Sequence, residues 1–261
     1  MNTLNLVINL KKDVRKREKM EMHLSDIGID FKFLDAIYGL DLKEEELSEF
    51  SDVETSRRLI GREINVGEIG CYLSHINAAK MLLESDFDFA LVLEDDVCIS
   101  KKILNVAKNG LIQTAFEHGA EICFLGHHST ISRSKEPLAK IKVKYKSDLF
   151  KVKHNIEAVH GAYGYILSRA AAKKLVDEYS IAQLPIDHVL GDPEKFNTVF
   201  VSPALISIDE ELGSLSNLDF FREKHSDDIS FSKLLIRKSR SAFLLFIRYM
   251  KLYYLHKNKF F

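Results

Sequence analysis

The sequence predicts an α/β protein with a mostly parallel central sheet that is covered by helices on both faces. Strand-like and helix-like segments alternate from residue 4 to about residue 126. The strand-like segments LNLVINL, FDFALVLE and AEICFLG are nearly continuous apolar runs, which is typical of strands buried on both faces. With 46% hydrophobic and 29% charged residues, the chain has an ordinary globular composition and enough length for one large domain with an appendage.

The elements of the first half follow from local patterns. After the strand LNLVINL (4–10), VRKREKMEMHLSDIG predicts a helix capped by Gly28, and its apolar side comprises Val14, Met20, Leu24 and Ile27. The alternating segment IDFKFLDAI predicts a second strand ending at Asp35. DLKEEELSEF predicts a small surface helix, SDVETSRRLIGREIN a polar loop, and GEIGCYLSHINAAKMLLES (67–85) a long helix.

The second half is read in the same way. SKKILNVAKNGLIQTAFEHG predicts one amphipathic helix with Ser100 as its N-cap, and AEICFLG (120–126) predicts another buried strand. The polar section 127–157 predicts loops with short antiparallel strands such as LFKVK. AVHGAYGYILSRAAAKKLVDEY predicts a glycine-broken strand followed by a helix capped by Ser168, and NTVFVSPALISI supplies one more strand.

Charge and cysteine usage bound the function. A formal net charge of −1 argues against a bulk nucleic-acid binder. The three cysteines (Cys71, Cys98, Cys123) lack metal-binding or disulfide spacing, which favours reduced, buried thiols in a cytoplasmic protein. The N-terminus lacks the charge order of a signal peptide, and no stretch approaches the ~18 apolar residues of a membrane span.

Three consecutive carboxylates end the most apolar strand. Because successive strand residues point to opposite faces, Glu94 and Asp96 are expected to share one direction and Asp95 to take the other. Ligands of open parallel sheets bind beyond the carboxyl ends of the strands. Two convergent carboxylates there suit Mg²⁺ or Mn²⁺, which would also neutralise a diphosphate leaving group. The alternative is a surface turn of solvated acids.

Five ordered motifs resemble those of glycosyltransferase family 25, the lipooligosaccharide galactosyl- and glucosyltransferases of Gram-negative bacteria, whose domain also occurs in collagen galactosyltransferases. The motifs are NLVINLKKDVRKREKMEMHLSDIGIDFKFLDAIYG, GEIGCYLSHINAAKMLLE, FALVLEDDV, GAYGYILSRAAAKKL and LPIDHVL. The resemblance covers about residues 4–210. It implies a GT-A-like domain over residues 1–215, a UDP-galactose or UDP-glucose donor, inversion at the anomeric carbon and commonly a divalent metal.

The resemblance also implies roles at the acidic strand end. Glu94 and Asp96 correspond to the DxD-type pair of GT-A enzymes, and Asp96 is the preferred direct ligand of Mn²⁺ or Mg²⁺. Asp95 is then a contact to the donor ribose or sugar. Glutamate replaces the first aspartate of that pattern, which leaves the ligand set open.

Further residues acquire candidate roles in donor binding. Asn9, at the end of the first strand, and Arg15 or Arg17, early in the next helix, are candidates to hold uracil, ribose or diphosphate. Either arginine is equally well read as an exposed helix residue. Asp35 is a candidate nucleoside contact or a turn-forming residue.

The later motifs add the remaining candidates. Ser74 and His75 are placed near the donor sugar, although a helical histidine is more often structural. In HGAYGY the glycines permit close backbone approach to a ligand, which makes Gly161 a donor-binding candidate. His160 is a candidate for the metal shell or a packing residue.

Inverting transfer needs a base that deprotonates the acceptor hydroxyl, and a carboxylate is the usual choice. Asp187 in PIDH is the preferred base, and capping of a helix that begins near His188 is the competing interpretation.

The end of the chain is basic and amphipathic. Residues 229–261 contain no Asp or Glu but eight cations, which are Lys233, Arg237, Lys238, Arg240, Arg248, Lys251, Lys257 and Lys259. Residues 216–261 therefore predict a helical tail that lies on the anionic inner face of the cytoplasmic membrane. Packing on the main domain and a dimer contact are the alternatives, and the oligomeric state stays open.

The expected function is transfer of a hexose, with galactose preferred, from a UDP-sugar to a lipid-linked lipooligosaccharide or other surface-glycan acceptor. A glucosyltransferase of the same fold, a non-catalytic membrane-bound glycan-assembly scaffold and a metal-dependent phosphohydrolase are the alternatives. The expected location is the cytoplasm, with peripheral membrane association and no nucleic-acid partner.

Overall fold

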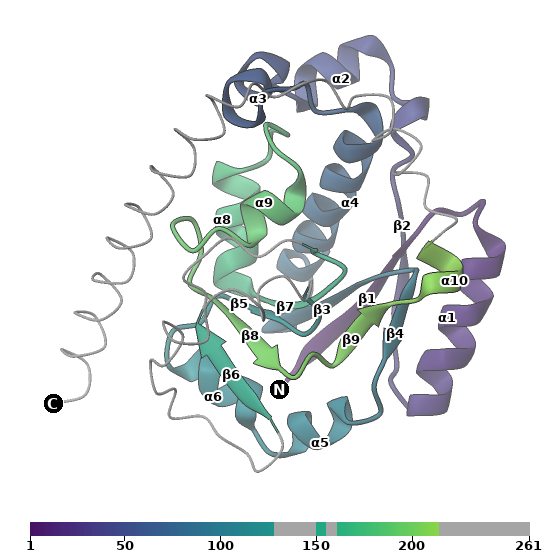
Figure 1. Ribbon diagram of the computed structural model, residues 1–261, viewed down its shortest axis with the longest axis vertical. Coiled ribbons are helices and arrows are strands. Elements are labelled where there is room, and N and C mark those ends of the chain that lie inside the picture. Colours follow the sequence, from purple (N-terminus) through teal and green to yellow (C-terminus); the bar gives the residue numbers. More distant parts are fainter. Residues whose placement is uncertain (128–149, 155–160, 214–261) are drawn as a thin grey trace, which may run out of the picture.

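A central seven-stranded sheet organises the chain, with strand order β2-β1-β3-β7-β5-β8-β6 (Figure 1). The computed structural model describes residues 1–127, 150–154 and 161–213. Within these ranges β4 and β9 form a separate two-stranded sheet. The strands are β1 (Thr3–Asn9), β2 (Lys32–Asp35), β3 (Phe89–Glu94), β4 (Val97–Ile99), β5 (Ile122–Phe124), β6 (Lys151–His154), β7 (Gly164–Ser168), β8 (Thr198–Ser202) and β9 (Ile206–Ile208).

The central sheet is mixed but mostly parallel, as the sequence predicts. Strand β1 runs parallel to both β2 and β3, and β5 runs parallel to β8. Strand β7 is antiparallel to β3 and β5, and β6 is antiparallel to β8. Five strands therefore share one direction and two run against it. The carboxyl ends of β1, β2 and β3 consequently meet at one edge of the sheet.

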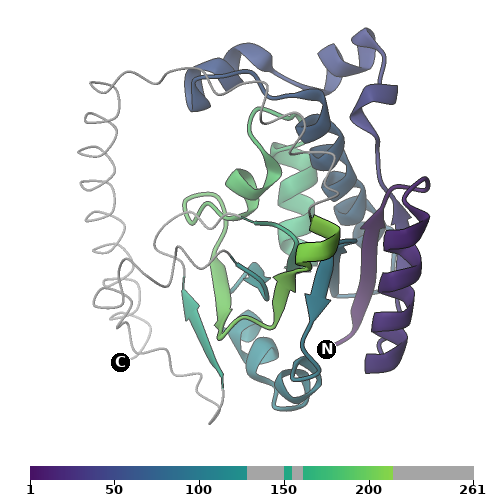
Figure 2. The same cartoon turned by 45° about the vertical axis from the view of Figure 1, so that its right-hand side comes forward.

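Helices cover both faces of the sheet (Figures 1 and 2). One core lies between the sheet and α4, α8 and α9, and the other between the sheet and α1, α5 and α6. The helical segments are α1 (Val14–Ile27), the 3₁₀ turn η1 (Gly39–Asp41), α2 (Glu44–Phe50), α3 (Val53–Ile60), α4 (Val66–Leu83), α5 (Ile103–Lys108), α6 (Leu111–Glu117), α8 (Arg169–Glu178), α9 (Ile186–Leu190) and α10 (Glu210–Gly213).

Helix α1 forms where the sequence predicts it and ends at Gly28, which adopts the left-handed conformation with φ of 78°. Its buried face differs from the prediction at one position. Val14 is exposed, and the buried position of the first turn is Lys16. The face therefore begins with a cation rather than a hydrophobic side chain, and that cation belongs to the site described below.

The predicted polar loop before α4 is wrong, because it contains helix α3. Asp52 caps this helix by accepting a hydrogen bond from the Thr55 backbone N–H at 2.9 Å. Ser56 is its one buried residue. The helix has only about two turns and few apolar residues, so its period is too short to stand out from a polar loop, although Asp52 and Gly61 mark its two ends.

The single helix predicted over 100–119 is also wrong. β4, which pairs with β9, ends just before this segment, and the segment itself forms two short helices separated at Gly110, where φ is 67°. Lys102 rather than Ser100 is the N-cap of α5. The predictions for β6, for β7 and for an α8 capped by Ser168 are confirmed.

The cysteines and the helix lengths bear on the environment of the chain. None of the three cysteines forms a disulfide, but only Cys123 is buried, whereas Cys71 is half-buried and Cys98 is exposed. In the described ranges, every helix is too short or too polar to cross a membrane. The tail predicted over 216–261 lies outside the described residues.

Candidate active site

Three parallel strands bring polar side chains together at one edge of the sheet. In the pairing of β1 with β2, Asn9 lies beside Asp35, and in the pairing of β1 with β3, Ile8 lies beside Glu94. The strand ends predicted to carry polar ligand-binding residues are therefore neighbours, although about 85 residues of chain separate Asn9 from Glu94.

The alternation of β3 separates Glu94 from Asp95. Glu94 lies on the α4 side of the sheet, where its Oε1 is 3.6 Å from Nε2 of His75. Asp95 lies on the α1 side and is only 8% exposed. Its Oδ2 accepts a hydrogen bond from Asn9 Nδ2 at 2.8 Å, and its Oδ1 accepts one from Lys16 Nζ at 3.0 Å. Asp95 is thus fully engaged by the protein's own side chains.

Asp96 does not take the direction that strand alternation predicts for it. Its Oδ2 lies 3.3 Å from the Lys16 ammonium, the same group that pairs with Asp95. The reason is that β3 ends at Glu94, so Asp95 and Asp96 form a turn before β4 begins. The period of two applies only within a strand. The turn consequently places both aspartates on one lysine.

The charges of this cluster do not balance. The acidic strand end holds three carboxylates and Lys16 supplies one ammonium, which pairs with Asp95 and Asp96, so two net negative charges remain when all four groups are ionised. Burial, followed by repulsion from Glu94, raises the pKa of Asp96 to about 6. Although burial by itself lowers the Lys16 pKa, attraction to Asp95 and Asp96 outweighs it and the pKa lies above its ordinary value. An added cation would therefore relieve this cluster.

Lys16 is the site residue that sequence reasoning missed. It occupies the same helical face as Met20 and Leu24, at spacings of four and eight residues, and its side chain is 10% exposed. That spacing was visible in the sequence. A lysine on the apolar face of a helix is rare unless it is paired, and the acidic strand end was the available partner.

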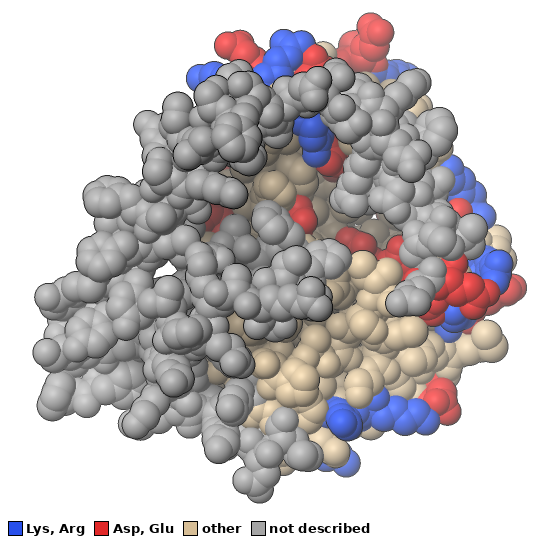
Figure 3. Space-filling view, in the orientation of Figure 1, with Lys and Arg blue, Asp and Glu red and all other residues tan. Residues whose placement is uncertain are grey.

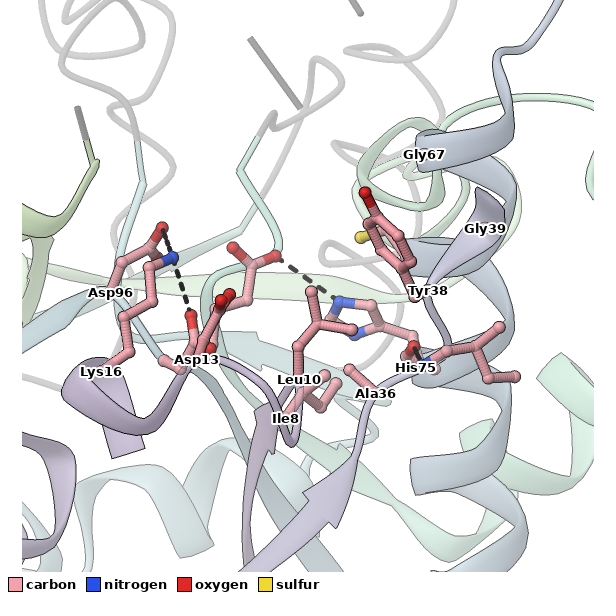
Figure 4. A pocket seen from close by; sticks show the side chains of 15 residues that line it. Ile8, Leu10, Asp13, Lys16, Ala36, Tyr38, Gly39, Gly67, His75 and Asp96 are labelled. Carbon is pink, nitrogen blue, oxygen red and sulfur yellow. Dashed lines mark hydrogen bonds and ion pairs between the residues drawn. The ribbon is translucent and has the colours of Figure 1, made fainter. Parts of the chain in front are cut away.

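These groups line one cavity with two contrasting parts (Figure 4). Charged side chains of the acidic strand end and α1 line one part. Apolar and aromatic side chains after β1 and β2 line the other. The lining residues include Leu10, Asp13, Lys16, Ala36, Tyr38, Cys71, His75, Glu94 and Asp96. Figure 3 shows acidic side chains in the recessed middle of the face seen in Figure 1.

Ser74 shapes the cavity by holding the loop after β2. Its hydroxyl accepts a hydrogen bond from the Ile37 backbone N–H at 2.8 Å and donates one to the Gly70 carbonyl at 2.7 Å. The loop also packs directly on α4, because a Cβ at Gly70 would lie 2.6 Å from the Gly39 backbone nitrogen. The contacts of Ser74 thus support the wall on which Tyr38 stands.

His75 is completely buried beneath the acidic strand end. Its Nδ1 lies 2.8 Å from the Tyr165 hydroxyl, and the two rings stack with centroids 5.7 Å apart. Its Nε2 points toward Glu94 (Figure 4). No described residue forms a hydrogen bond with Nε2. The histidine therefore reaches the predicted site from beneath it.

The two candidate arginines of α1 lie outside the cavity lining. Arg15 pairs with Glu211 of α10, and both side chains are largely exposed. Arg17 places its guanidinium 4.0 Å from the centre of the Phe33 ring, and its Nη1 lies 3.9 Å from Oδ1 of Asp35. Asp35 also pairs with Lys11 at 2.9 Å and is half exposed. These residues form a charged rim beside Asn9.

Asp187 lies in the first turn of α9, where Pro185 rather than Asp187 is the N-cap. Its Oδ2 accepts a hydrogen bond from the Gly161 backbone N–H at 3.2 Å, and Gly161 has a φ of 98°. The Tyr163 carbonyl, two residues later, accepts a hydrogen bond from the Glu94 N–H at 3.0 Å. Asp187 and Gly161 are thus connected to the acidic strand end, while His160 lies outside the described residues.

The fold and the cavity define an α/β protein with a charged cavity beyond the carboxyl ends of parallel strands. Its family is shown by sequence: the profile of glycosyltransferase family 25 (LPS biosynthesis protein) matches residues 2–190. The chain belongs to that family, as the five motifs indicated.

Curated relatives come from animals and bacteria. Procollagen galactosyltransferase 1-A of Xenopus laevis is 29% identical over 194 residues, which is 70% of this chain and 30% of that protein. Lipooligosaccharide biosynthesis protein lic2B of Haemophilus influenzae is 26% identical over 189 residues, which is 72% of this chain and 67% of that protein. The chain thus spans about a third of the length of the animal relatives.

Among solved structures, a chain described as S. aureus TarS 1-349 is similar over 79% of this chain and 60% of its own length, with a TM-score of 0.39 and 14% sequence identity. So distant a similarity carries no argument about the fold or function of this chain.

Proposed function

We propose that this chain is a metal-dependent, inverting galactosyltransferase of GT-A-like fold that uses UDP-galactose and a lipooligosaccharide or other surface-glycan acceptor. The main observation in support of this proposal is the cavity at the ends of β1, β2 and β3, which joins an acidic cluster to an apolar, aromatic wall. A sugar nucleotide has matching parts, since its diphosphate needs charge compensation and its base needs a flat apolar surface.

The acidic part fits a hard divalent cation. Glu94 and Asp96 offer carboxylate oxygens beside the cavity, and oxygen ligands are those that Mn²⁺ and Mg²⁺ prefer. The net double negative charge of the cluster matches a divalent ion. When bound, the ion would neutralise charge on the leaving diphosphate. Lys16 holds Asp95 and Asp96 in place and limits their repulsion.

The apolar part suits the nucleoside. Tyr38, Leu10 and Ala36 form a wall next to the charged end (Figure 4). The ammonium of Lys12 lies 3.0 Å from the centre of the Tyr38 ring. Asn9 and Asp35 end β1 and β2 beside this wall, and Arg17 of α1 reaches both of them, so the three form a polar rim for ribose or base. Arg15 is turned toward Glu211 and supplies positive charge at a greater distance.

Asp187 is the proposed base that receives the proton of the acceptor hydroxyl. Its carboxylate is partly exposed, at 23%, so a hydroxyl can reach it. The Gly161 N–H binds Oδ2, whereas Oδ1 lies 4.0 Å from Nε2 of His188 and is the oxygen proposed to receive that proton. The backbone between Gly161 and Tyr163 spans at most about 7 Å, which keeps the base near the acidic strand end. His160 stays a proposed member of the metal shell.

The acceptor and the location are inferred from the sequence and the relatives. A lipooligosaccharide biosynthesis protein among the relatives supports a lipid-linked acceptor. The basic residues of 216–261 would then bring the enzyme to the anionic inner face of the cytoplasmic membrane. Removal of residues after about 229 should preserve UDP release while abolishing binding to vesicles of anionic lipid. Loss of folding would instead show that the segment packs on the domain.

A donor screen tests the function. The chain is incubated with UDP-galactose, UDP-glucose and UDP-N-acetylhexosamines, with and without Mn²⁺, and UDP release is measured. UDP release only with Mn²⁺ and highest with UDP-galactose supports the proposal, and Asp96→Asn should lower it while the exposed control Asp26→Asn should not. Preference for UDP-glucose would make it a glucosyltransferase. If the protein neither binds UDP nor releases it from any donor, the non-catalytic glycan-assembly scaffold is favoured. Release of phosphate from simple esters would favour a metal-dependent phosphohydrolase.

A further inference from the structure

Three potential metal ligands of two different elements converge beneath the acidic strand end. Cys71 and His75 are one turn apart on α4, and Glu94 ends β3. One ligand atom of each residue lies within 4.8 Å of the other two. All three residues line the cavity. Unlike the all-carboxylate pair Glu94 and Asp96, this set offers one sulfur, one nitrogen and one oxygen.

The buried imidazole of His75 points to a ligand. The residue is 0% exposed, and no described residue forms a hydrogen bond with its Nε2. A buried polar atom without a hydrogen bond is unfavourable, so such atoms need a specific explanation. The other ring nitrogen is held by the Tyr165 hydroxyl at 2.8 Å. When Nδ1–H donates to that hydroxyl, the Nε2 lone pair faces Glu94, as in histidines oriented for a metal.

The spacing of the ligand atoms is close to that of a tetrahedral site. Zinc binds nitrogen and oxygen at about 2.0–2.2 Å and thiolate at about 2.3 Å, so neighbouring ligand atoms lie roughly 3.3–3.8 Å apart. The separation of His75 Nε2 from Glu94 Oε1 is already 3.6 Å. Since the Cys71 sulfur lies within 4.8 Å of the other two atoms, it needs to approach by at most about 1 Å, which a side-chain rotation can provide.

We infer that Cys71, His75 and Glu94 form a second metal site, selective for a soft divalent ion such as Zn²⁺ and completed by a water or a ligand oxygen. Sulfur and imidazole ligands favour Zn²⁺ over Mn²⁺ or Mg²⁺. Three protein ligands with an open fourth position are characteristic of exchangeable zinc sites. Because Glu94 belongs to both sets, occupation by Zn²⁺ withdraws this carboxylate from Asp96. Zn²⁺ bound here therefore competes with the Mn²⁺ or Mg²⁺ that we propose binds to Glu94 and Asp96.

Cobalt spectroscopy of the full chain tests this site directly. Metal-free protein titrated with Co²⁺ should show intense tetrahedral d–d absorption and a thiolate-to-cobalt charge-transfer band. Cys71→Ala should abolish the charge-transfer band, whereas Cys98→Ala, which removes the exposed cysteine, should leave it unchanged. A cobalt spectrum without the thiolate charge-transfer band would overturn the proposal. A charge-transfer band that persists in Cys71→Ala would do the same.

Zinc affinity, measured by competition with a chromophoric chelator, gives an independent readout. His75→Gln should weaken Zn²⁺ binding at least 100-fold, and Tyr165→Phe, which removes the partner that orients the ring, about 10–100-fold. Equal affinities in wild type and both variants would contradict the assignment.

Alkylation of the wild-type protein covers the case in which variants fail to fold. Zn²⁺ should slow modification of Cys71 by iodoacetamide at least tenfold while the rate at Cys98 stays constant. Equal Cys71 rates with and without Zn²⁺ would exclude the site. These measurements use no sugar donor, so a failure of the proposed transferase activity would leave this inference intact. Likewise, absence of the zinc site would leave the proposed transferase activity intact.

Discussion

The Lys16 ammonium lies 3.0 Å from Oδ1 of Asp95, and both side chains are about 10% exposed. This buried ion pair joins the first turn of α1 to the end of β3. Because Asn9 fills the other oxygen of Asp95, the pair fixes the turn that presents Asp96 and the neighbouring Glu94 to the cavity. The same contact thus supports the fold and positions the candidate site.

Loss of this buried cation should destabilise the protein strongly. Lys16→Met leaves two buried carboxylates without their cation, and removal of one partner of a buried pair typically costs about 3–5 kcal/mol. Urea unfolding at neutral pH measures the effect. Lys101→Met, which removes a cation from the exposed pair with Asp26, is the control and should unfold like wild type. Equal midpoints for both variants would show that the Lys16 pair contributes nothing.

Asp96 should give the metal-free protein an unusual pH dependence. Its folded pKa of about 6 lies above the ordinary value of 3.8, so the folded state binds this proton more tightly than the unfolded state. The stability that this proton contributes to the folded state is fully present below about pH 4 and is lost as the pH rises through about 6. The increase of the Asp96 pKa from 3.8 to about 6 corresponds to at most about 3 kcal/mol of unfolding free energy.

The comparison with Asp96→Asn isolates this contribution from that of other carboxylates. The free energy of unfolding of wild type, relative to that of the variant, should fall between pH 4 and pH 7 in urea titrations. A difference that stays constant over this range, or rises, would show that the Asp96 pKa is not raised.

A methyl group at Gly70 should disturb the wall that carries Tyr38. A Cβ there would lie 2.6 Å from both the Gly39 backbone nitrogen and the Ile37 carbonyl oxygen. Gly70→Ala should therefore cost about 1–3 kcal/mol of stability, despite the higher helix propensity of alanine, and weaken UDP binding measured by calorimetry. Lys80→Ala, at an exposed position of the same helix, is the control. Increased stability with unchanged UDP affinity would contradict the close approach.

Asp187 should be required for transfer but not for binding of the donor. Asp187→Asn keeps an oxygen for the Gly161 N–H and removes the charge that accepts a proton. The rate of transfer should fall by about 10²–10⁴-fold while UDP affinity with Mn²⁺ stays constant. Asp177→Asn, in an exposed pair on α8, is the control. A variant that transfers sugar at the wild-type rate would remove Asp187 from the mechanism.

The sequence by itself determined the central architecture, because the short continuous apolar runs of β1, β3 and β5 are typical of strands buried on both faces and the apolar segment of α4 is long enough for a buried helix. It also identified the acidic strand end, since carboxylates directly after a buried strand have few structural explanations, and it carried the family motifs. The helix α3 was missed because it has only about two turns, and the break at Gly110 was missed because a single glycine does not by itself end a helical pattern.

Only the tertiary structure decided which groups meet. The pairing of β1 with β3 places Asn9 and Lys16 around Asp95, and the turn after Glu94 moves Asp96 onto the same lysine. The tertiary structure also directs Ser74 toward the loop after β2 and Arg15 toward Glu211. It places His75 beneath Glu94. Side-chain periodicity describes a single element, whereas contacts between elements depend on register and turn geometry, which no local pattern in this chain encodes.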